Sequence, residues 1–248
     1  MRGARGIVRK CASRAEAVVR RALPQHCELC AARTEGALLC AACAADLPRV
    51  AAACPVCGLP SADRAICGAC LRDPPPYAQT VAALAYAFPV DRLVQRIKYG
   101  GSIALGHWAG TTLAAAVCAK LERSAAGDRP QQIVALPLSA PRQRERGFNQ
   151  AGISAARVAA ATSLPLAAPL ERLPGGLPQA ALPWVARRRN VRGAFAVRGA
   201  VRGVRIALVD DVMTTGATLI EASLALIGAG AARVDCWVVA RTLRPEQD

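Results

Sequence analysis

Apolar runs of strand length alternate along most of the chain with segments in which apolar residues return every three or four positions. The strand-like runs, rich in β-branched residues, are 81–88, 133–138, 204–209 and 234–240. The segments with helical spacing are 90–98, 103–121, 149–161 and the stretch that begins at Leu219. Strands that alternate with helices in this way predict an α/β domain with a parallel sheet and flanking helices.

The strand 204–209 runs directly into the most informative loop of the sequence. Two acids, Asp210 and Asp211, follow the strand, and a turn with three threonines and Gly216 precedes the next helix. Loops at the carboxyl ends of strands in open α/β sheets bind ligands, and a helix N-terminus offers backbone N–H groups to an anion. Threonine hydroxyls add donors, and glycine lets the backbone come close. The pattern predicts a phosphate site.

The two acids adjoin this phosphate site without touching the phosphate itself. Carboxylate oxygens accept hydrogen bonds from neighbouring hydroxyls, such as those of a ribose 2',3'-diol. The alternative is an ordinary strand-to-helix turn in which Asp and Thr cap the helix. Capping needs one such residue, whereas this loop has two acids, three threonines and a glycine in tight order. We therefore favour the ligand-binding interpretation.

The run from Leu208 to Thr218 resembles the PRPP-binding motif of type I phosphoribosyltransferases. The resemblance implies that Asp210 and Asp211 hold the ribose hydroxyls. It also implies that the 5'-phosphate is held by Thr214, Thr215, Gly216, Ala217 and Thr218.

A second loop follows the strand 133–138 and carries three closely spaced arginines, Arg142, Arg144 and Arg146. In a phosphoribosyltransferase the first such loop holds pyrophosphate, and guanidinium groups match phosphate oxygens with paired hydrogen bonds. The alternative is a solvated basic loop. The resemblance places further PRPP contacts at Lys98, Leu138, Ser139, Arg142 and Arg146.

Eight of the eleven cysteines form C-x2-C pairs, which indicates metal binding rather than disulfides in a chain with no sign of secretion. Tetrahedral Zn2+ takes four thiolates, so the four pairs supply two complete sites. Sequential pairing is the simplest arrangement, and the sequence also allows an interleaved one. The predicted ligands are Cys27, Cys30, Cys40, Cys43, Cys54, Cys57, Cys67 and Cys70.

Both predicted zinc sites are full, so we interpret them as structural. The metal would supply folding free energy that a module of about 45 residues cannot draw from its core. A redox role for the cysteine pairs is the weaker alternative. Eight thiolates already fill both zinc sites, so we do not expect His26, next to Cys27, to bind metal. Gly58 and Gly68, each directly after a cysteine, suit the positive φ that such knuckles often need.

The length of the chain bounds its domain organisation, and its net charge suggests the kind of partner it binds. The 248 residues divide into a basic amphipathic helix at 1–26, a double zinc ribbon at 27–73 and an α/β domain at 77–244, with a proline-rich break at 73–76. The net charge of +15 favours a polyanionic partner, although only three of the 32 basic residues are lysine and coding bias explains part of the excess. No apolar run reaches the roughly 18 residues of a membrane span, and the expected protein is soluble and unexported.

The segment from Arg172 to Phe195 lacks periodicity and holds the basic run Arg187, Arg188 and Arg189. Loops of this length are often lids over an active site. The basic run is instead a candidate contact for single-stranded DNA, and the sequence leaves both interpretations open.

Four zinc knuckles, an Arg-Gly-Phe-Asn-Gln-Ala stretch, the 179–195 segment and the PRPP loop, in this order, resemble the ComF family. The resemblance implies a double zinc ribbon before a type I phosphoribosyltransferase-like domain in a cytoplasmic bacterial protein. It further implies a role in natural competence, in which transforming single-stranded DNA is taken up beside a helicase-like partner protein. Arg146 and Asn149 carry the family's own motif.

Whether the chain is an enzyme stays open at this stage. Phosphoribosyl transfer needs Mg2+ with PRPP, cations on the departing pyrophosphate and an acceptor held in line. The sequence supplies the PRPP half of this machinery and shows no recognisable acceptor pocket. Two hypotheses follow: a transferase with an unknown acceptor, or a domain that binds PRPP without turnover in a protein that handles DNA.

Overall fold

The computed structural model describes residues 25–174 and 193–243. Residues 1–24 of the predicted basic helix therefore lie outside the described residues. The run Arg187–Arg189 lies outside them as well. The chain divides into two compact units, Met1–Leu47 and Pro48–Asp248. The division falls between the second and third C-x2-C pairs, so the last two pairs belong to the larger unit.

The smaller unit is a minimal ribbon. Its antiparallel strands β1 (Gln25–His26) and β2 (Arg33–Thr34) form a two-residue ladder, and α2 (Ala41–Ala45) follows. The hydroxyl of Thr34 donates to the carbonyl of Ala37 at 2.6 Å. Elements this short bury little apolar surface, so we expect the described part of this unit, residues 25–47, to depend on its cysteines for stability.

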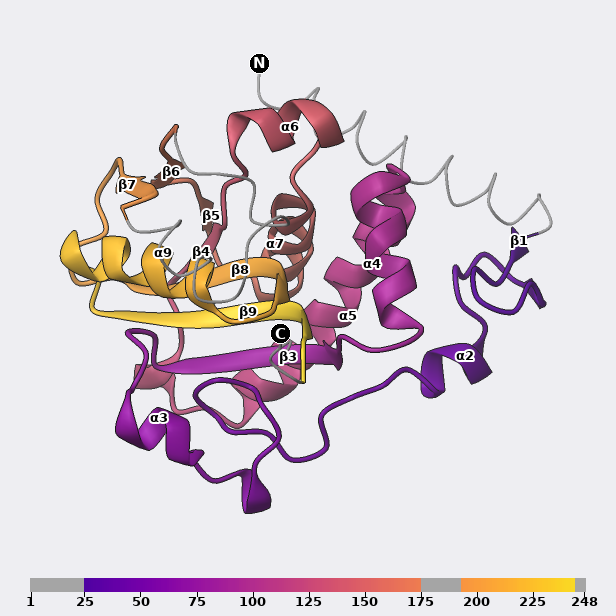
Figure 1. Ribbon diagram of the computed structural model, residues 1–248, viewed down its shortest axis with the longest axis horizontal. Coiled ribbons are helices and arrows are strands. Elements are labelled where there is room, and N and C mark those ends of the chain that lie inside the picture. Colours follow the sequence, from indigo (N-terminus) through magenta and orange to yellow (C-terminus); the bar gives the residue numbers. More distant parts are fainter. Residues whose placement is uncertain (1–24, 175–192, 244–248) are drawn as a thin grey trace, which may run out of the picture. The chain divides into compact units, whose positions relative to one another are not determined.

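The larger unit is built on a five-stranded sheet in the order β3-β9-β8-β4-β5, in which every neighbouring pair is parallel (Figure 1). This confirms the predicted α/β class with a parallel sheet. The strands are β3 (Gln79–Ala85), β4 (Gln132–Ala135), β5 (Leu166–Ala167), β8 (Arg205–Met213) and β9 (Arg233–Arg241), and a separate antiparallel pair is formed by β6 (Leu170–Arg172) and β7 (Phe195–Val197).

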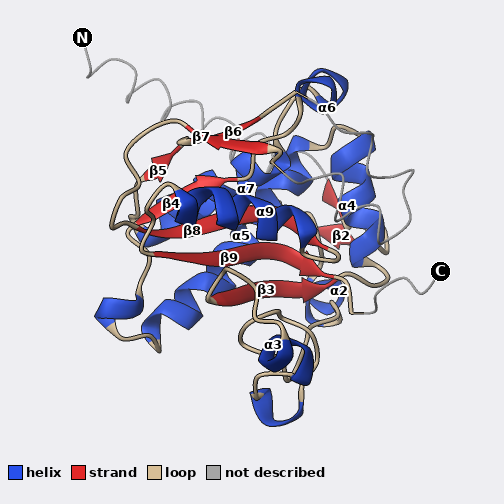
Figure 2. Cartoon of the chain, turned by 60° about the vertical axis from the view of Figure 1, so that its left-hand side comes forward, coloured by secondary structure: helices blue, strands red, loops and turns tan. Residues whose placement is uncertain are grey.

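Helices cover both faces of this sheet (Figure 2). α9 packs on one face with β7, β8 and β9, while α5 and α7 pack together on the other face, against β3, β4, β8 and β9. The bounds are α3 (Gly68–Arg72), α4 (Val90–Tyr99), α5 (Ile103–Glu122), α6 (Ala140–Arg146), α7 (Gln150–Thr162) and α9 (Ala217–Gly228). No helix in the described ranges is long and apolar enough to cross a membrane.

Successive side chains of β8 are buried on the two opposite faces of the sheet. Ile206 and Leu208 on β8 belong to the cluster that contains Leu219 and Leu226 of α9. Ala207, the intervening residue, is also fully buried, because successive side chains of a strand point to opposite faces and this sheet is covered on both.

The connections reverse direction between β4 and β8. From β4 the chain passes through α6 and α7 to β5 at the outer edge, whereas from β8 it passes through α9 to β9 on the other side. Open α/β sheets bind ligands in the crevice that such a reversal leaves at the carboxyl ends of the strands. The two loops singled out in the sequence are the ones that border this crevice.

Three local predictions need correction. The strand predicted at 204–209 continues to Met213, because β9 goes on pairing with it at Asp210, Val212 and Met213. The predicted arginine-rich turn is the helix α6, which ends at Gly147 with φ 73°. The strands β5, β6 and β7 were not predicted, because two or three residues are too few to show a period.

Candidate functional site

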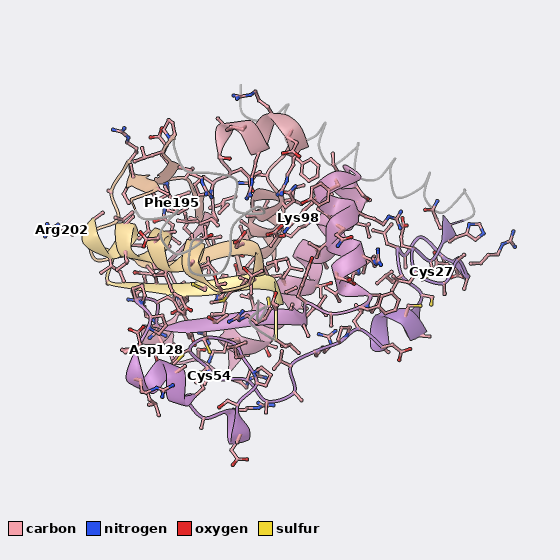
Figure 3. The ribbon with its side chains drawn as sticks, viewed as in Figure 1. Cys27, Cys54, Lys98, Asp128, Phe195 and Arg202 are labelled. Atoms are coloured by element: carbon pink, nitrogen blue, oxygen red, sulfur yellow. The ribbon has the colours of Figure 1, made fainter. Side chains whose placement is uncertain are left out.

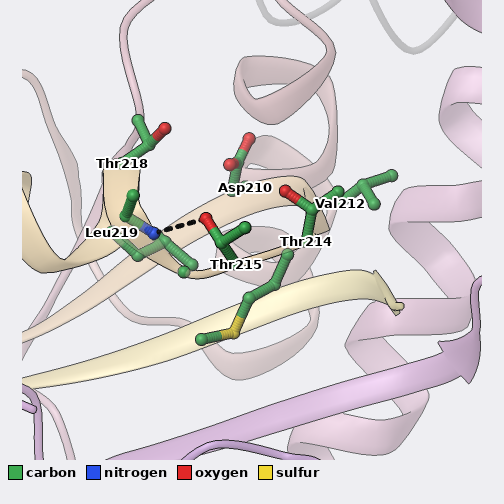
Figure 4. A pocket seen from close by; sticks show the side chains of 9 residues that line it. Asp210, Val212, Thr214, Thr215, Thr218 and Leu219 are labelled. Carbon is green, nitrogen blue, oxygen red and sulfur yellow. Dashed lines mark hydrogen bonds between the residues drawn. The ribbon is translucent and has the colours of Figure 1, made fainter. Parts of the chain in front are cut away.

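Residues 214–218, between β8 and the first turn of α9, form the predicted phosphate loop. Its turn depends on Gly216, where φ is +81° and an added Cβ would lie 2.9 Å from the Cε of Met213. The hydroxyl of Thr215 accepts a hydrogen bond from the N–H of Ala217 at 3.2 Å, at the start of α9 (Figure 4). The loop encloses a small cavity of about 30 Å³ lined by Asp210 and 212–219.

The two acids lie at the end of β8 beside this cradle. The N–H of Asp211 donates to Oδ1 of Asp210 at 2.8 Å, and the N–H of Val212 donates to Oδ1 of Asp211 at 2.7 Å. The Nζ of Lys98, from α4, lies 3.0 Å from Oδ2 of Asp211. Burial, and after it the neighbouring charge of Asp211, raises the pKa of Asp210 to about 8. Asp210 therefore keeps its proton to a higher pH than an ordinary carboxyl does.

Cations from three elements face these acids across a cavity of about 430 Å³ at the crevice. Lys98 comes from α4, Arg142 and Arg146 from α6, and Arg172 from β6. Burial and the charge of Arg142 lower the pKa of Arg172, whose guanidinium lies 5.4 Å from the ring centre of Phe195. Guanidinium groups held this close together in one cavity favour a polyanionic ligand.

The structure brings the residues predicted for PRPP together. All but one line either the crevice cavity or the loop cavity, and both cavities include Asp210, Val212, Thr214 and Thr218. The exception, Ser139, lies one residue beyond Leu138 and precedes α6, and its side chain makes no capping hydrogen bond there. Their role as PRPP ligands stays a prediction.

Asn149 has a positioning role. Its Nδ2 donates to the carbonyl of Leu136 at 3.0 Å, and its Oδ1 accepts from the N–H of Ala151 at 3.0 Å. The side chain thereby caps α7 and joins the start of that helix to the chain leaving β4. Within the Arg-Gly-Phe-Asn-Gln-Ala stretch, Asn149 therefore fixes the position of α7, while Arg146 lines the cavity itself.

Among the cavity's residues that the sequence analysis missed are two tyrosines and an arginine: Tyr86, Tyr99 and Arg172. Tyr99 is 71% exposed, and the guanidinium of Arg146 lies 5.9 Å from its ring centre. Neither tyrosine stands in a recognisable motif. Arg172 opens a segment without periodicity, so only its proximity to Arg142 in the folded chain reveals it.

The eight predicted metal ligands form two groups in sequential pairing. Cys27, Cys30, Cys40 and Cys43 make the first cluster, and Cys54, Cys57, Cys67 and Cys70 make the second cluster. The sulfurs of each group lie within 4.8 Å of one another. Gly58 has the expected positive φ of 72°, whereas Gly68 is the first residue of α3.

The sulfur spacing fits zinc. A tetrahedral ion with Zn–S bonds of about 2.3 Å puts its sulfurs ~3.8 Å apart. The Sγ atoms of Cys30 and Cys40 lie 3.7 Å apart, and so do those of Cys57 and Cys67. Four thiolates in each cluster leave no position for substrate, so both clusters suit structural zinc.

Comparisons with known proteins agree with this arrangement. The family model "Double zinc ribbon domain" matches residues 18–71. The chain is 33% identical over 171 residues to the "DNA utilization protein YhgH" of Salmonella typhimurium, which covers 68% of this chain and 75% of that protein. It is 31% identical over 163 residues to "Competence protein F" of Haemophilus influenzae, at 63% and 69% coverage.

Solved structures give a more distant similarity. The PRPP amidotransferase from B. subtilis is 23% identical, with a TM-score of 0.36 over 54% of this chain and 26% of that one. The purine phosphoribosyltransferase from Pyrococcus horikoshii is 17% identical, with a TM-score of 0.35 over 57% of this chain and 90% of the other. Scores this low carry no argument about function.

Proposed function

The chain belongs to the ComF/YhgH family, with a double zinc ribbon and a phosphoribosyltransferase-like domain, and from this premise we propose that it binds PRPP with Mg2+ and handles single-stranded DNA in the cytoplasm. The observation that carries the first part is the crevice cavity, in which the acids of β8, the phosphate loop and cations from three elements converge. Each of these groups matches one part of the ligand.

The match follows the ligand from end to end. The 5'-phosphate occupies the loop 214–218, where hydroxyls and the N-terminus of α9 offer donors. The ribose diol donates to Asp210 and Asp211. The pyrophosphate extends toward Arg142, Arg146 and Arg172, whose guanidinium groups pair with its oxygens.

Mg2+ suits this donor set. It takes oxygen ligands and usually binds through one or two carboxylates together with substrate phosphates. Asp210 and Asp211 provide carboxylates beside the region proposed for pyrophosphate. When bound, the ion would offset negative charge on the pyrophosphate. The chain's own residues orient the diol, anchor the phosphate and complete the charge balance with guanidinium groups.

Lys98 ties the site to α4. Its ammonium group pairs with Asp211 at 3.0 Å, and both side chains are only about one-fifth exposed. A ribose hydroxyl or a metal ion that takes the Asp211 oxygens displaces this partner. The freed ammonium group then lies close to the incoming pyrophosphate, so the same residue neutralises the site before and after binding.

The test is titration calorimetry of the zinc-loaded, full-length protein with PRPP and Mg2+. Replacement of both acids, Asp210→Asn with Asp211→Asn, should abolish binding and leave the zinc content unchanged. The control is Asp128→Asn, which removes one carboxylate charge before β4, at the end of the strands opposite the site (Figure 3). Retained binding in the double variant would overturn the assignment of the diol.

The DNA-handling part rests on the names of the relatives, "DNA utilization protein" and "Competence protein F", and on the net charge of +15. We propose a helicase-like competence protein as the partner at the membrane. A short single-stranded oligonucleotide added to the calorimetry tests whether DNA and PRPP binding are coupled. Coupling would change the affinity of each ligand by the same factor.

A second candidate function is transfer of the phosphoribosyl group to an acceptor. The observation that favours it is the pair Tyr86 and Tyr99 in the crevice cavity, since aromatic rings stack on planar acceptors. Release of pyrophosphate from PRPP in the presence of candidate bases tests this function. If no base or oligonucleotide stimulates release above the rate in water, binding without turnover is the better description.

A further inference from the structure

Arg241 joins three segments at the base of the phosphate loop. It is the last residue of β9 and only 4% exposed. Its Nε donates to the carbonyl of Cys57 at 2.8 Å, and its Nη1 donates to the carbonyls of Met213 at 2.9 Å, Thr242 at 3.1 Å and Thr214. One buried side chain thus connects a cysteine of the second cluster with the residues from which the loop departs.

The second cluster is fastened to the sheet at a neighbouring point. The N–H of Thr80, on β3, donates to the carbonyl of Pro55 at 2.9 Å, and the Thr80 hydroxyl donates to the carbonyl of Val56 at 2.6 Å. Gly58 has a φ of +72°, and an added Cβ there would lie 3.2 Å from the Cγ2 of Thr80. The knuckle therefore packs tightly against the strand, with little room for a side chain at this position.

The charge of Arg241 also favours its position beside the second cluster. A guanidinium group this deeply buried is costly unless negative charge lies near it. Its four hydrogen-bond acceptors named above are all backbone carbonyls. Four thiolates around one zinc ion carry a net negative charge, and the second cluster lies directly beside Arg241. With zinc bound, this cluster would offset the charge of the residue that holds the loop.

We propose that Arg241 is a positioning residue through which zinc in the second cluster orders the phosphate loop. Zinc fixes the carbonyl of Cys57, this carbonyl holds the guanidinium, and the guanidinium holds the carbonyls of Met213 and Thr214. The directions of those two peptide units set the direction of the donors that follow in the loop. Loop order thus depends on the second cluster and is independent of the first.

Hydrogen exchange on the zinc-loaded, full-length protein without ligand tests this coupling. In Arg241→Lys, which keeps the charge but cannot reach the same set of carbonyls, exchange in a peptide covering 213–219 should rise about tenfold. In Thr80→Val, which removes the hydroxyl bond to Val56, it should rise ~threefold. The matched control Thr34→Val removes the equivalent hydroxyl bond in the smaller unit and should leave the loop unchanged.

Cysteine variants test the role of the metal itself. Cys67→Ser should lower the zinc content from two ions to one and raise exchange in the loop, whereas Cys30→Ser should lower the zinc content equally and leave the loop unchanged. If Cys67→Ser also opens β8, Thr80→Val becomes the deciding variant. Unchanged loop exchange in Arg241→Lys and Thr80→Val would overturn the proposal, as would an equal effect of Cys30→Ser.

The ligand-bound part of this inference rests on the proposed function, but its test does not. Exchange is measured without PRPP, so a wild-type protein that fails to bind PRPP overturns the proposed function and leaves the coupling intact. If PRPP does bind, Arg241→Lys should weaken the affinity about tenfold without loss of zinc. An unchanged affinity would show that the loop binds phosphate without this support.

Discussion

The two cysteine clusters are locally almost the same and differ in their surroundings. Each has the spacing C-x2-C-x9-C-x2-C, and in each the third cysteine precedes a five-residue helix, Cys40 before α2 and Cys67 before α3. In the first cluster Cys27 alone is buried and Cys30 is exposed. In the second cluster three of the four cysteines are buried and pack with Val56 and Leu59.

The difference lies in what each cluster is attached to. The first cluster organises a unit whose strands are two residues long. The second is bonded to β3 through Thr80 and to the phosphate loop through Arg241. Ligand spacing therefore decides that a metal binds, and the surrounding contacts decide whether the metal serves a local fold or a distant site.

The largest effect expected is on the stability of the larger unit. Arg241→Lys should lower the free energy of unfolding by about 3 kcal/mol, because charge-assisted hydrogen bonds are lost and buried carbonyls are left unpaired. Urea unfolding followed by the fluorescence of Trp237, which is buried on β9, measures it. The control Arg205→Lys, at a partly exposed arginine that donates to the carbonyl of Arg129, should cost less than ~1 kcal/mol. Equal costs would remove the distinction between the two sites.

Zinc should leave the two clusters at different rates. The first cluster has an exposed cysteine and opens locally, so a chelator should strip it about tenfold faster than the second. Release followed with a chromogenic chelator should show two phases in the wild-type protein. Cys30→Ser should remove the fast phase and Cys67→Ser the slow one. A single phase in the wild type would show that the attachment to the sheet does not protect the second metal.

The pH dependence of stability should be concentrated in the larger unit. Burial and the charge of Asp211 raise the pKa of Asp210 from 3.8 to about 8, while Lys98 opposes this shift. The folded chain therefore keeps a proton that the unfolded chain has lost above pH ~4, and this contribution to stability falls as the pH rises toward 8.

Unfolding at pH 5 and pH 8.5 checks this sign. The loss of stability between these two values should be smaller in Asp210→Asn than in the wild type, and Asp128→Asn should behave as the wild type does. PRPP affinity should rise over the same range, because the diol donates to the ionised carboxylate. A pH profile that Asp210→Asn leaves unchanged would contradict the assignment.

The smallest effect expected concerns DNA. Replacement of Arg187, Arg188 and Arg189 with alanine should lower the slope of log affinity against log salt by about 2, at ~0.7 for each lost contact with a single strand. These residues lie outside the described structure, so this prediction rests on the sequence. Cys30→Ser should leave the slope unchanged. An altered slope in that variant would bring the smaller unit into the DNA site.

Much of the fold could be predicted because its signals are local. The helices α4, α5 and α7 and the strand β9 begin and end within about two residues of their predicted bounds, since apolar periodicity and length identify elements of this size. The end of β8 could not be predicted in this way. Acidic residues normally mark the end of a strand, and only pairing with β9 keeps Asp210 and Asp211 within it.

The site residues likewise divide into those that could be predicted from the sequence and those that only the fold reveals. The phosphate loop and its acids are contiguous in the sequence, so one short stretch is enough to predict their chemistry. Arg172, Tyr86 and Tyr99 carry no motif and reach the cavity only because the connections reverse between β4 and β8. Arg241 is likewise an ordinary strand end in the sequence.

By itself the sequence determined the chemistry that depends on neighbouring residues: the metal ligands, whose spacing sets the reach of their sulfurs, and the loop that precedes α9. The tertiary structure alone decided which cluster adjoins the phosphate loop, which carboxyl has a raised pKa and which cations face it. These properties depend on burial and on charges brought together from distant segments, and both arise only when the sheet has formed.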